Sequence, residues 1–157
     1  MSQTPLNELM VTRHIAADPD AVWDVMVNRT GEWWCPVPWR AVVTHWDRQP
    51  GGRCEMVMYG PEGEVMPQLG TFLAWEEGRR FASTDAVKGD LEPAGPMMIG
   101  IWEIEPDGEG TRYTARARHW SEEAMAKHRD MGFEQGWGAA ADQLAAICER
   151  EAGALGG

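Results

Sequence analysis

The stretch MGFEQGWGAAADQLAAI, residues 131–147, decides the fold class because it predicts one long helix with a single apolar face. Its apolar residues recur at intervals of three and four, which is the repeat of an α-helix buried along one side. The apolar stripe comprises Phe133, Trp137, Ala140, Ala141, Leu144, Ile147 and Cys148. A helix of this kind buries its stripe against a second layer, which the rest of the chain has to supply.

A shorter helix is expected directly before the long one. Ser121 is a suitable N-cap, and the two glutamates that follow it suit the first turn of a helix. We expect this helix to reach about His128 and the long one to continue through Arg150. Roughly 22 residues at about 1.5 Å each span about 33 Å, enough to cross a small domain. Glycines at positions 132, 136 and 138 predict either close approach to the other layer or space beside the backbone.

The middle of the chain predicts six short strands separated by turns that are rich in glycine and proline. They are AVVTHW (41–46), CEMVMY (54–59), GTFLAW (70–75), FASTDA (81–86), MMIGIWEIE (97–105) and TRYTARARHW (111–120). Strands that follow one another so closely favour an antiparallel meander over parallel crossovers. This meander is the layer against which we expect the long helix to pack.

Alternation along the last strand indicates which of its faces is buried. Arginines share one face, which is therefore expected to contact water. The opposite face, expected to point inward, carries Tyr113, Ala115, Ala117 and His119. The same alternation in the second strand points inward the side chains of Cys54, Met56 and Met58.

The segment before the meander predicts one strand and two short helices. Residues 8–15, ELMVTRHI, have the composition of a strand. Residues 17–28, ADPDAVWDVMVN, predict an amphipathic helix with Pro19 at its first position. Residues 28–34, NRTGEWW, indicate a turn and a second brief helix, which Pro36 ends. The whole chain of 157 residues has the length of one α+β domain.

Three of the nine tryptophans lie within the stretch GEWWCPVPWR, residues 31–40. Two prolines in this stretch exclude a regular helix or strand. We therefore interpret Trp33, Trp34 and Trp39 as rings that close the mouth of an apolar cavity, where indoles meet both water and an apolar interior.

The net charge of the chain limits the kinds of partner that it is expected to bind, and its cysteine content indicates the cellular compartment. The formal net charge of −11 disfavours nucleic acid and anionic lipid surfaces as partners. Nothing approaches an apolar run of about 18 residues, so we expect no membrane insertion. Three widely spaced cysteines and the absence of a secretory signal predict a reducing, cytoplasmic setting. The histidines and cysteines lack metal-ligand spacing and no cofactor motif is found, so we expect neither metal nor cofactor.

Five motifs in order carry a resemblance to a known family. They are IAADPDAVWDVMVNRTGEWW, PGGRCEMVMYGPEGE, GTFLAWEEGRRFASTDA, GTRYTARARHWSEE and MGFEQGWGAAADQLAAI. Over residues 8–150 the chain resembles the START and birch-pollen-allergen superfamily (SRPBCC), in its branch of homologues of the heat-shock-protein ATPase activator. The resemblance implies a helix-grip fold, in which a curved antiparallel sheet of about six to seven strands surrounds the long C-terminal helix, with two short helices after the first strand. It also implies a cavity for ligand binding or, in some relatives, polyketide cyclisation. It implies no shared set of catalytic residues.

The sequence also predicts which residues line the cavity expected between the sheet and the long helix. Its ligand-binding residues are predicted to be Trp33, Trp34, Trp39, Met56, Met58, Trp102, Tyr113, His119, Phe133 and Trp137. Methionines adapt to irregular guests, and the two polar members provide the few handles that such a pocket needs. The alternative is that these side chains simply pack a filled core.

Three hypotheses of function follow from this reading. The first is a non-enzymatic carrier or sensor of a small hydrophobic or aromatic ligand. The second is a cyclase or isomerase in which His119 and Tyr113 are the candidate catalytic groups. The third is a co-chaperone-like module that binds a chaperone or a second copy of itself. The sequence does not decide between a monomer and a homodimer.

Overall fold

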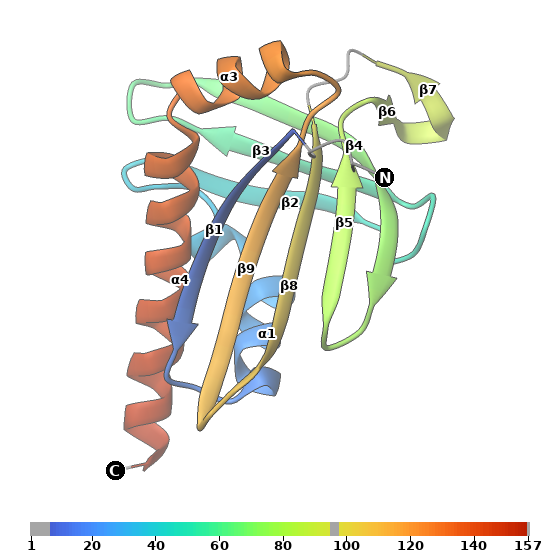
Figure 1. Cartoon of the computed structure of the whole chain (residues 1–157). Coiled ribbons are helices and arrows are strands. Elements are labelled where there is room, and N and C mark those ends of the chain that lie inside the picture. The colour runs from blue at the N-terminus through green and yellow to red at the C-terminus, as the bar shows by residue number, and fades with distance from the viewer. Residues whose placement is uncertain (1–6, 95–97, 157) are drawn as a thin grey trace.

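The computed structural model describes residues 7–94 and 98–156. Its main layer is an antiparallel sheet of seven strands, and the long helix α4 (Phe133–Gly156) lies beside it (Figure 1). The strands are β1 (Glu8–Ile15), β2 (Arg40–Trp46), β3 (Arg53–Tyr59), β4 (Val65–Glu76), β5 (Arg80–Thr84), β8 (Ile99–Asp107) and β9 (Gly110–Arg118). The sheet is bent, so that β2 and β3 cross steeply behind β1 and β9 (Figure 1). The predicted helix-grip fold is confirmed.

The order of strands across the sheet is β1-β9-β8-β5-β4-β3-β2. β2 to β5 form the predicted meander, and β5 then pairs with β8. Between these two strands the chain makes an excursion through β6 (Val87–Lys88), η1 (Gly89–Leu91) and β7 (Glu92–Pro93). β1 adds to the far side of β9, from Glu8 opposite Arg118 to Ile15 opposite Thr111. The first strand of the chain therefore lies beside the last.

Several strand boundaries differ from the prediction, most of all those of β4 and β8, while β5 ends at Thr84 and β9 at Arg118, two residues earlier than predicted. β4 begins at Val65 rather than at residue 70, because residues 65–69 continue to pair with β3 after the Gly60–Gly63 turn. β8 begins at Ile99, and Met97, where the predicted strand starts, lies outside the described residues. β8 also runs on through Pro106, so the hairpin turns later than its proline-aspartate-glycine sequence predicts.

The short helices lie where the sequence predicts them. α1 (Pro19–Asn28) starts with its proline at the N-terminal turn, and α2 (Thr30–Trp33) is a single turn. α3 (Glu122–Asp130) is capped as expected, because the hydroxyl of Ser121 accepts a hydrogen bond from the backbone N–H of Ala124. Gly132, with a φ of 99°, then turns the chain into α4.

The predicted apolar stripe of α4 is buried along its whole length. Ala140, Ala141 and Leu144 are 0% exposed, and the other four members of the stripe are 9% exposed or less. The glycines do not mark contact with the sheet throughout, since a Cβ at Gly136 would meet nothing within 4 Å. At Gly138 it would approach the guanidinium of Arg13 in β1 at 3.1 Å. The backbone of α4 therefore borders open space at Gly136 and the side chain of Arg13 at Gly138.

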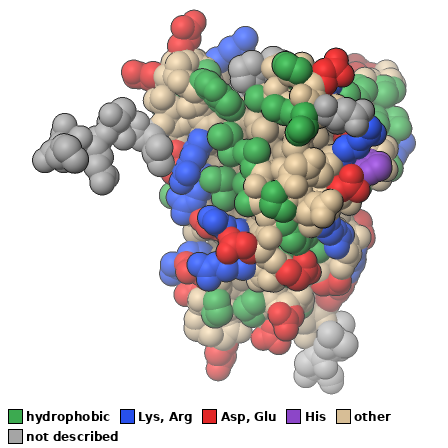
Figure 2. Space-filling model, turned by 90° about the vertical axis from the view of Figure 1, so that its right-hand side faces the viewer, with side chains coloured by type: hydrophobic (Ala, Val, Ile, Leu, Met, Phe, Trp, Pro, Cys, Tyr) green, Lys and Arg blue, Asp and Glu red, His purple; other side chains and the backbone are tan. Residues whose placement is uncertain are grey.

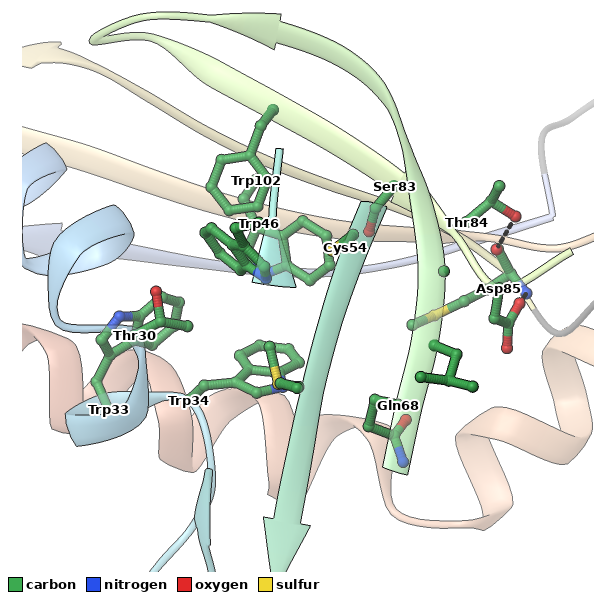
Figure 3. A pocket seen from close by; sticks show the side chains of 15 residues that line it. Thr30, Trp33, Trp34, Trp46, Cys54, Gln68, Ser83, Thr84, Asp85 and Trp102 are labelled. Carbon is green, nitrogen blue, oxygen red and sulfur yellow. Dashed lines mark hydrogen bonds between the residues drawn. The ribbon is translucent and has the colours of Figure 1, made fainter. Parts of the chain in front are cut away.

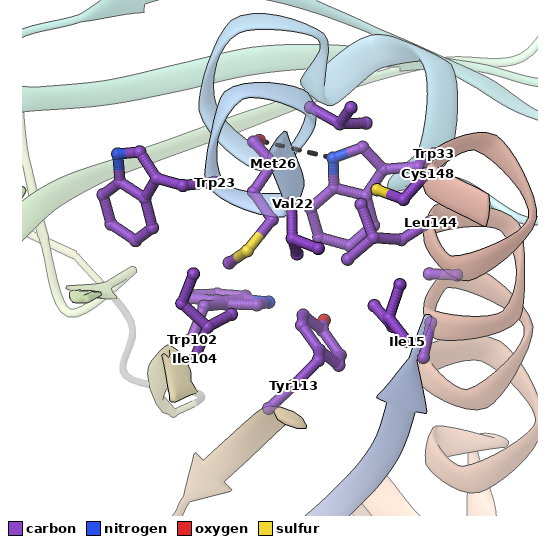
Figure 4. Packing of buried hydrophobic residues seen from close by; sticks show 14 of the residues in the cluster. Ile15, Val22, Trp23, Met26, Trp33, Trp102, Ile104, Tyr113, Leu144 and Cys148 are labelled. Atoms are coloured by element: carbon purple, nitrogen blue, oxygen red, sulfur yellow. Dashed lines mark hydrogen bonds between the residues drawn. The ribbon is translucent and has the colours of Figure 1, made fainter. Parts of the chain in front are cut away.

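Large side chains from every layer meet in the core (Figure 4). The bulkiest that are fully buried include Trp33, Tyr113, Phe72, Ile15, Met26 and Leu144. They come from helices α1, α2 and α4 and from strands β1, β4 and β9. Tyr113 on β9 faces Trp33 at 6.0 Å between ring centroids, so the α2 turn is pressed onto the inner face of the sheet.

One side of the molecule carries exposed apolar side chains. Val65, Met66, Leu69 and Leu73 of β4 are between 45% and 59% exposed. Figure 2 shows hydrophobic side chains gathered on the side along which β4 runs in Figure 1. Among the described residues, none of the helices combines the length and the hydropathy required to cross a bilayer.

Candidate functional site

A cavity of about 140 Å³ lies between the inner face of the sheet and the α2 turn (Figure 3). Its aromatic wall consists of Trp33, Trp34, Trp46, Phe81 and Trp102. Sulfur atoms from Cys54, Met56 and Met98 complete the apolar lining. The remaining lining residues are Thr30, Gln68, Leu69, Gly70, Ser83, Thr84 and Asp85.

A column of four stacked rings forms part of this wall and continues beyond it. Trp75, Phe81, Trp102 and Trp137 follow one another at centroid separations of 5.2, 5.2 and 5.4 Å, with interplanar angles of 19°, 19° and 18°. These rings come from β4, β5, β8 and α4. Burial and stacking of such large rings stabilise the wall, so one side of the cavity is preformed.

The α2 turn brings two indoles to the other side. The N–H of Trp33 donates to the carbonyl oxygen of Met26 at 3.3 Å, which draws this ring into the core. Trp34 packs edge-on against Trp102 and Trp137, with centroids at 5.4 and 5.1 Å. The prediction that Trp33 stands at the mouth is wrong, because its side chain is only 1% exposed and lies at the interior end. Trp33 therefore contributes to the inner wall of a cavity that is partly open to solvent.

A β-bulge brings Trp46 into the wall. The pairing of β2 with β3 is regular up to Val43 opposite Met56 and then shifts, so that His45 lies opposite Glu55 and Trp46 opposite Cys54. A bulge inserts one residue and reverses the alternation beyond it. Trp46 therefore faces inward beside Phe72 and Phe81, at 5.3 and 5.6 Å between centroids. Strict alternation would have placed its ring on the outer face.

The polar groups at the cavity are few. The carboxylate of Asp85 accepts a hydrogen bond from the backbone N–H of Met98 at 3.2 Å. It is the single charged side chain of the lining among the described residues. Burial raises the pKa of the Cys54 thiol to about 12, so this group is neutral at physiological pH.

Two side-chain nitrogens in the wall have no partner. The indole nitrogens of Trp46 and Trp102 are buried and make no hydrogen bond within the described protein. The indole nitrogen of Trp102 lies on the side of the Tyr113 hydroxyl (Figure 4), which is likewise buried and unpartnered. Burying such groups without a partner costs free energy, so all three are unusual for a well-packed interior.

Four of the ten predicted lining residues line the cavity, namely Trp33, Trp34, Met56 and Trp102. Trp39 and Met58 instead pack around a small second cluster that includes Cys35 and Ala41. Phe133 and Trp137 are buried in the main core, with Trp137 behind Trp102. Their role in ligand binding stays a prediction. The cavity is also lined by Trp46, Phe81 and Asp85, which the sequence analysis did not predict as lining residues.

The two candidate catalytic groups do not reach the lining. His119 donates from Nδ1 to the carbonyl oxygen of Asn7 at 3.1 Å, and its Nε2 lies 2.9 Å from Nδ1 of His128. Because a carbonyl only accepts, His119 carries its proton on Nδ1 and accepts at Nε2 from His128. Burial lowers the pKa of His128, and the neighbouring His119 lowers it further. Burial raises the pKa of Tyr113, which is 0% exposed, so its hydroxyl keeps its proton.

No group of three or more histidine, cysteine, aspartate or glutamate side chains suited to a metal ion occurs in residues 7–94 and 98–156. The arrangement supports the accommodation of an apolar guest beside a small number of polar side chains.

Comparisons with known proteins agree with this architecture. The family model described as Activator of Hsp90 ATPase homolog 1-like protein matches residues 16–149. A crystal structure of a protein from Nitrosomonas europaea is 33% identical, with a TM-score of 0.85 and coverage of 96% of this chain and 98% of that chain. One from Mycobacterium smegmatis is 27% identical, with a TM-score of 0.75 and 90% of each chain covered. The AHSA1 protein from Silicibacter pomeroyi, 20% identical with a TM-score of 0.68 over 92% and 99% of the two chains, has the same fold. None of the curated protein sequences matches the chain.

Proposed function

We propose that this chain, which belongs to the Activator of Hsp90 ATPase homolog 1-like family, binds a small hydrophobic or aromatic molecule as a non-enzymatic carrier or sensor. The observation that carries the proposal is the cavity of about 140 Å³, which is lined by indole rings and partly open to solvent. A dry apolar cavity of about 150 Å³ in another protein admits benzene, so a single ring is the expected size of guest.

The lining supports binding rather than catalysis. Aromatic and sulfur-bearing side chains provide contact area without a nucleophile or base among them, since the Cys54 thiol stays protonated. His119 and Tyr113 are absent from the described lining, so no observation favours the cyclase or isomerase alternative. The co-chaperone alternative and the homodimer stay predictions that the exposed apolar side chains of β4 motivate.

The proposal is tested by occupying the cavity with a side chain. Cys54→Phe places a ring where the guest is expected, whereas Cys54→Ser at the same position leaves the volume open. Toluene should raise the melting temperature of the native protein and of Cys54→Ser, because a ligand of the folded state stabilises it, and should leave that of Cys54→Phe unchanged. An equal shift in all three proteins, or a shift in none, would contradict binding at this cavity.

A further inference from the structure

The cavity has two ends of different chemical character (Figure 3). Trp33, Trp46 and Trp102 lie toward one end, and Gln68 and Asp85 lie toward the other. Trp33 and Trp102 are 1% and 7% exposed, whereas Gln68 is an exposed residue. The apolar end is therefore the closed one, and the polar end is the one that contacts water. A guest that fills both ends has an apolar part and a polar part.

Hydrogen bonds with the main chain fix the carboxylate at the polar end. Asp85 follows directly after β5, and its carboxylate accepts from the backbone N–H of Met98, just before β8, at 3.2 Å. The hydroxyl of Thr84 donates to the carbonyl oxygen of Met98 at 3.0 Å and accepts from the backbone N–H of Ala86 at 3.1 Å. These bonds join the ends of the two strands beside the carboxylate, so its charge has a defined position on the wall of the cavity.

The charge of the lining selects the polar part of the guest. A carboxylate or phosphate on the guest would be repelled by Asp85 and would find no lysine, arginine or histidine among the described residues that line the cavity. A positive charge is attracted by the same carboxylate. Because the polar end contacts water, an ammonium group bound there keeps part of its hydration and avoids the cost of full burial. The lining therefore favours a cation over an anion.

We propose that the cavity binds an organic cation, namely a single-ring aromatic amine whose ring lies at the indole-lined end and whose ammonium group meets Asp85 at the polar end. The inference rests on the proposed function, since it names the class of guest for the same cavity. The volume of about 140 Å³ limits the guest to one ring, and the carboxylate selects its charge. The formal net charge of −11 assists, because it attracts cations toward the protein from solution.

Three probes of nearly equal size test the preference for a positive charge. Benzylamine is a cation at neutral pH, benzyl alcohol is neutral, and benzoate is an anion. Asp85 is half-buried, so its attraction for an ammonium group should exceed that of a fully exposed ion pair. We expect benzylamine to bind about 5- to 10-fold more tightly than benzyl alcohol, and benzoate to bind more weakly than both. Titrations followed by the chemical shifts of the protein in nuclear magnetic resonance spectra give the three dissociation constants.

Two variants that each remove one negative charge assign the preference to the cavity. Asp85→Asn keeps an oxygen that can accept from Met98 but carries no charge, so the ratio of the dissociation constants of benzyl alcohol and benzylamine should fall toward one. Glu109→Gln changes the net charge equally at an exposed position in the turn between β8 and β9, and its ratio should stay as in the native protein. The ratio is the readout, since a loosened fold affects the binding of both probes.

The possible outcomes separate this inference from the proposed function. If benzyl alcohol binds as tightly as benzylamine, or if benzoate binds most tightly, the cationic guest is overturned while the proposed function stands. A preference for benzylamine that persists in Asp85→Asn also overturns it, because the preference then comes from the net charge of the chain. If none of the three probes binds but toluene raises the melting temperature, the inference fails alone. If toluene has no effect either, both proposals fail.

Discussion

The side-chain amide of Gln143 in α4 donates to the backbone carbonyl oxygen of Cys35 at 2.8 Å. The same nitrogen donates to the carbonyl of Trp33 at 2.9 Å, and the amide oxygen accepts from the backbone N–H of Val37 at 3.0 Å. One side chain of the long helix therefore holds the irregular segment that follows α2. The position of the two indoles in the cavity wall depends on this attachment.

Replacing Gln143 with alanine should destabilise the protein and loosen the cavity wall. Three hydrogen bonds to backbone groups are lost, and we expect the free energy of unfolding to fall by about 2 kcal/mol. Urea unfolding measures the change, and near-ultraviolet circular dichroism reports on the indoles. Gln135→Ala, at an exposed position of the same helix, should cost less than about 0.5 kcal/mol. Equal effects of the two variants would show that the attachment contributes nothing.

Replacing Tyr113 with phenylalanine should stabilise the protein. The hydroxyl is fully buried and has no partner among the described residues, so its removal relieves the cost of desolvation. We expect the free energy of unfolding to rise by about 1 kcal/mol. Thermal or urea unfolding of the two proteins provides the comparison. A decrease in stability would mean that the hydroxyl makes a favourable interaction in solution.

The His128 side chain should make stability depend on pH below neutrality. Burial is the largest cause that lowers its pKa from the ordinary value of 6.5, and His119 lowers it further, while Asp85 acts in the opposite direction. As the pH falls below 6.5, the unfolded chain gains a proton before the folded protein does. The free energy of unfolding should therefore be fully retained above this value and should decrease as the pH falls toward the lower, folded pKa.

Comparison with His128→Gln isolates this contribution from that of the other ionisable groups. Urea unfolding at several pH values between neutrality and the onset of acid unfolding should show a smaller loss of stability in the variant. Parallel profiles for the two proteins would exclude a role for His128.

The three cysteine thiols should react slowly with alkylating reagents in the native protein. Burial raises the pKa of Cys54 to about 12 and those of Cys35 and Cys148 to about 11, so little thiolate is present at pH 8. Iodoacetamide followed by mass spectrometry should modify all three rapidly only in denaturant. Fast modification of native Cys54 would show that its environment is more open than the structure indicates.

Periodicity predicted the fold because burial on one face leaves a regular trace in the sequence. The stripe of α4 and the inward face of β9, with Tyr113 and Ala115, follow this rule, although Thr114 on the outer face of β9 is buried as well. The position of Trp46 could not be predicted in this way. The bulge after Val43 changes the register by one residue, and nothing in the composition of AVVTHW marks it.

The cavity lining was harder to predict than the fold because it depends on how rings from different strands divide the interior. Trp137 has the burial expected of a lining residue, yet it stacks behind Trp102 and is separated from the cavity by that ring. His119 likewise points inward but meets His128 at the end of α3. The alternation of apolar and polar residues along a strand predicts which side chains point into the interior. Only the packing of those side chains against one another determines which of them line the cavity.

The stacked column of Trp75, Phe81, Trp102 and Trp137 has an optical consequence. Its three indoles lie close enough for excitation absorbed by one to migrate to another before emission, since Trp102 and Trp137 are 5.4 Å apart between ring centroids and only the ring of Phe81 separates Trp75 from Trp102. Light absorbed on β4 or on α4 can therefore be emitted from the ring of β8. The intrinsic luminescence of the protein should behave as the response of a coupled array of chromophores, with a short depolarisation time and a sensitivity to whatever disturbs any single member.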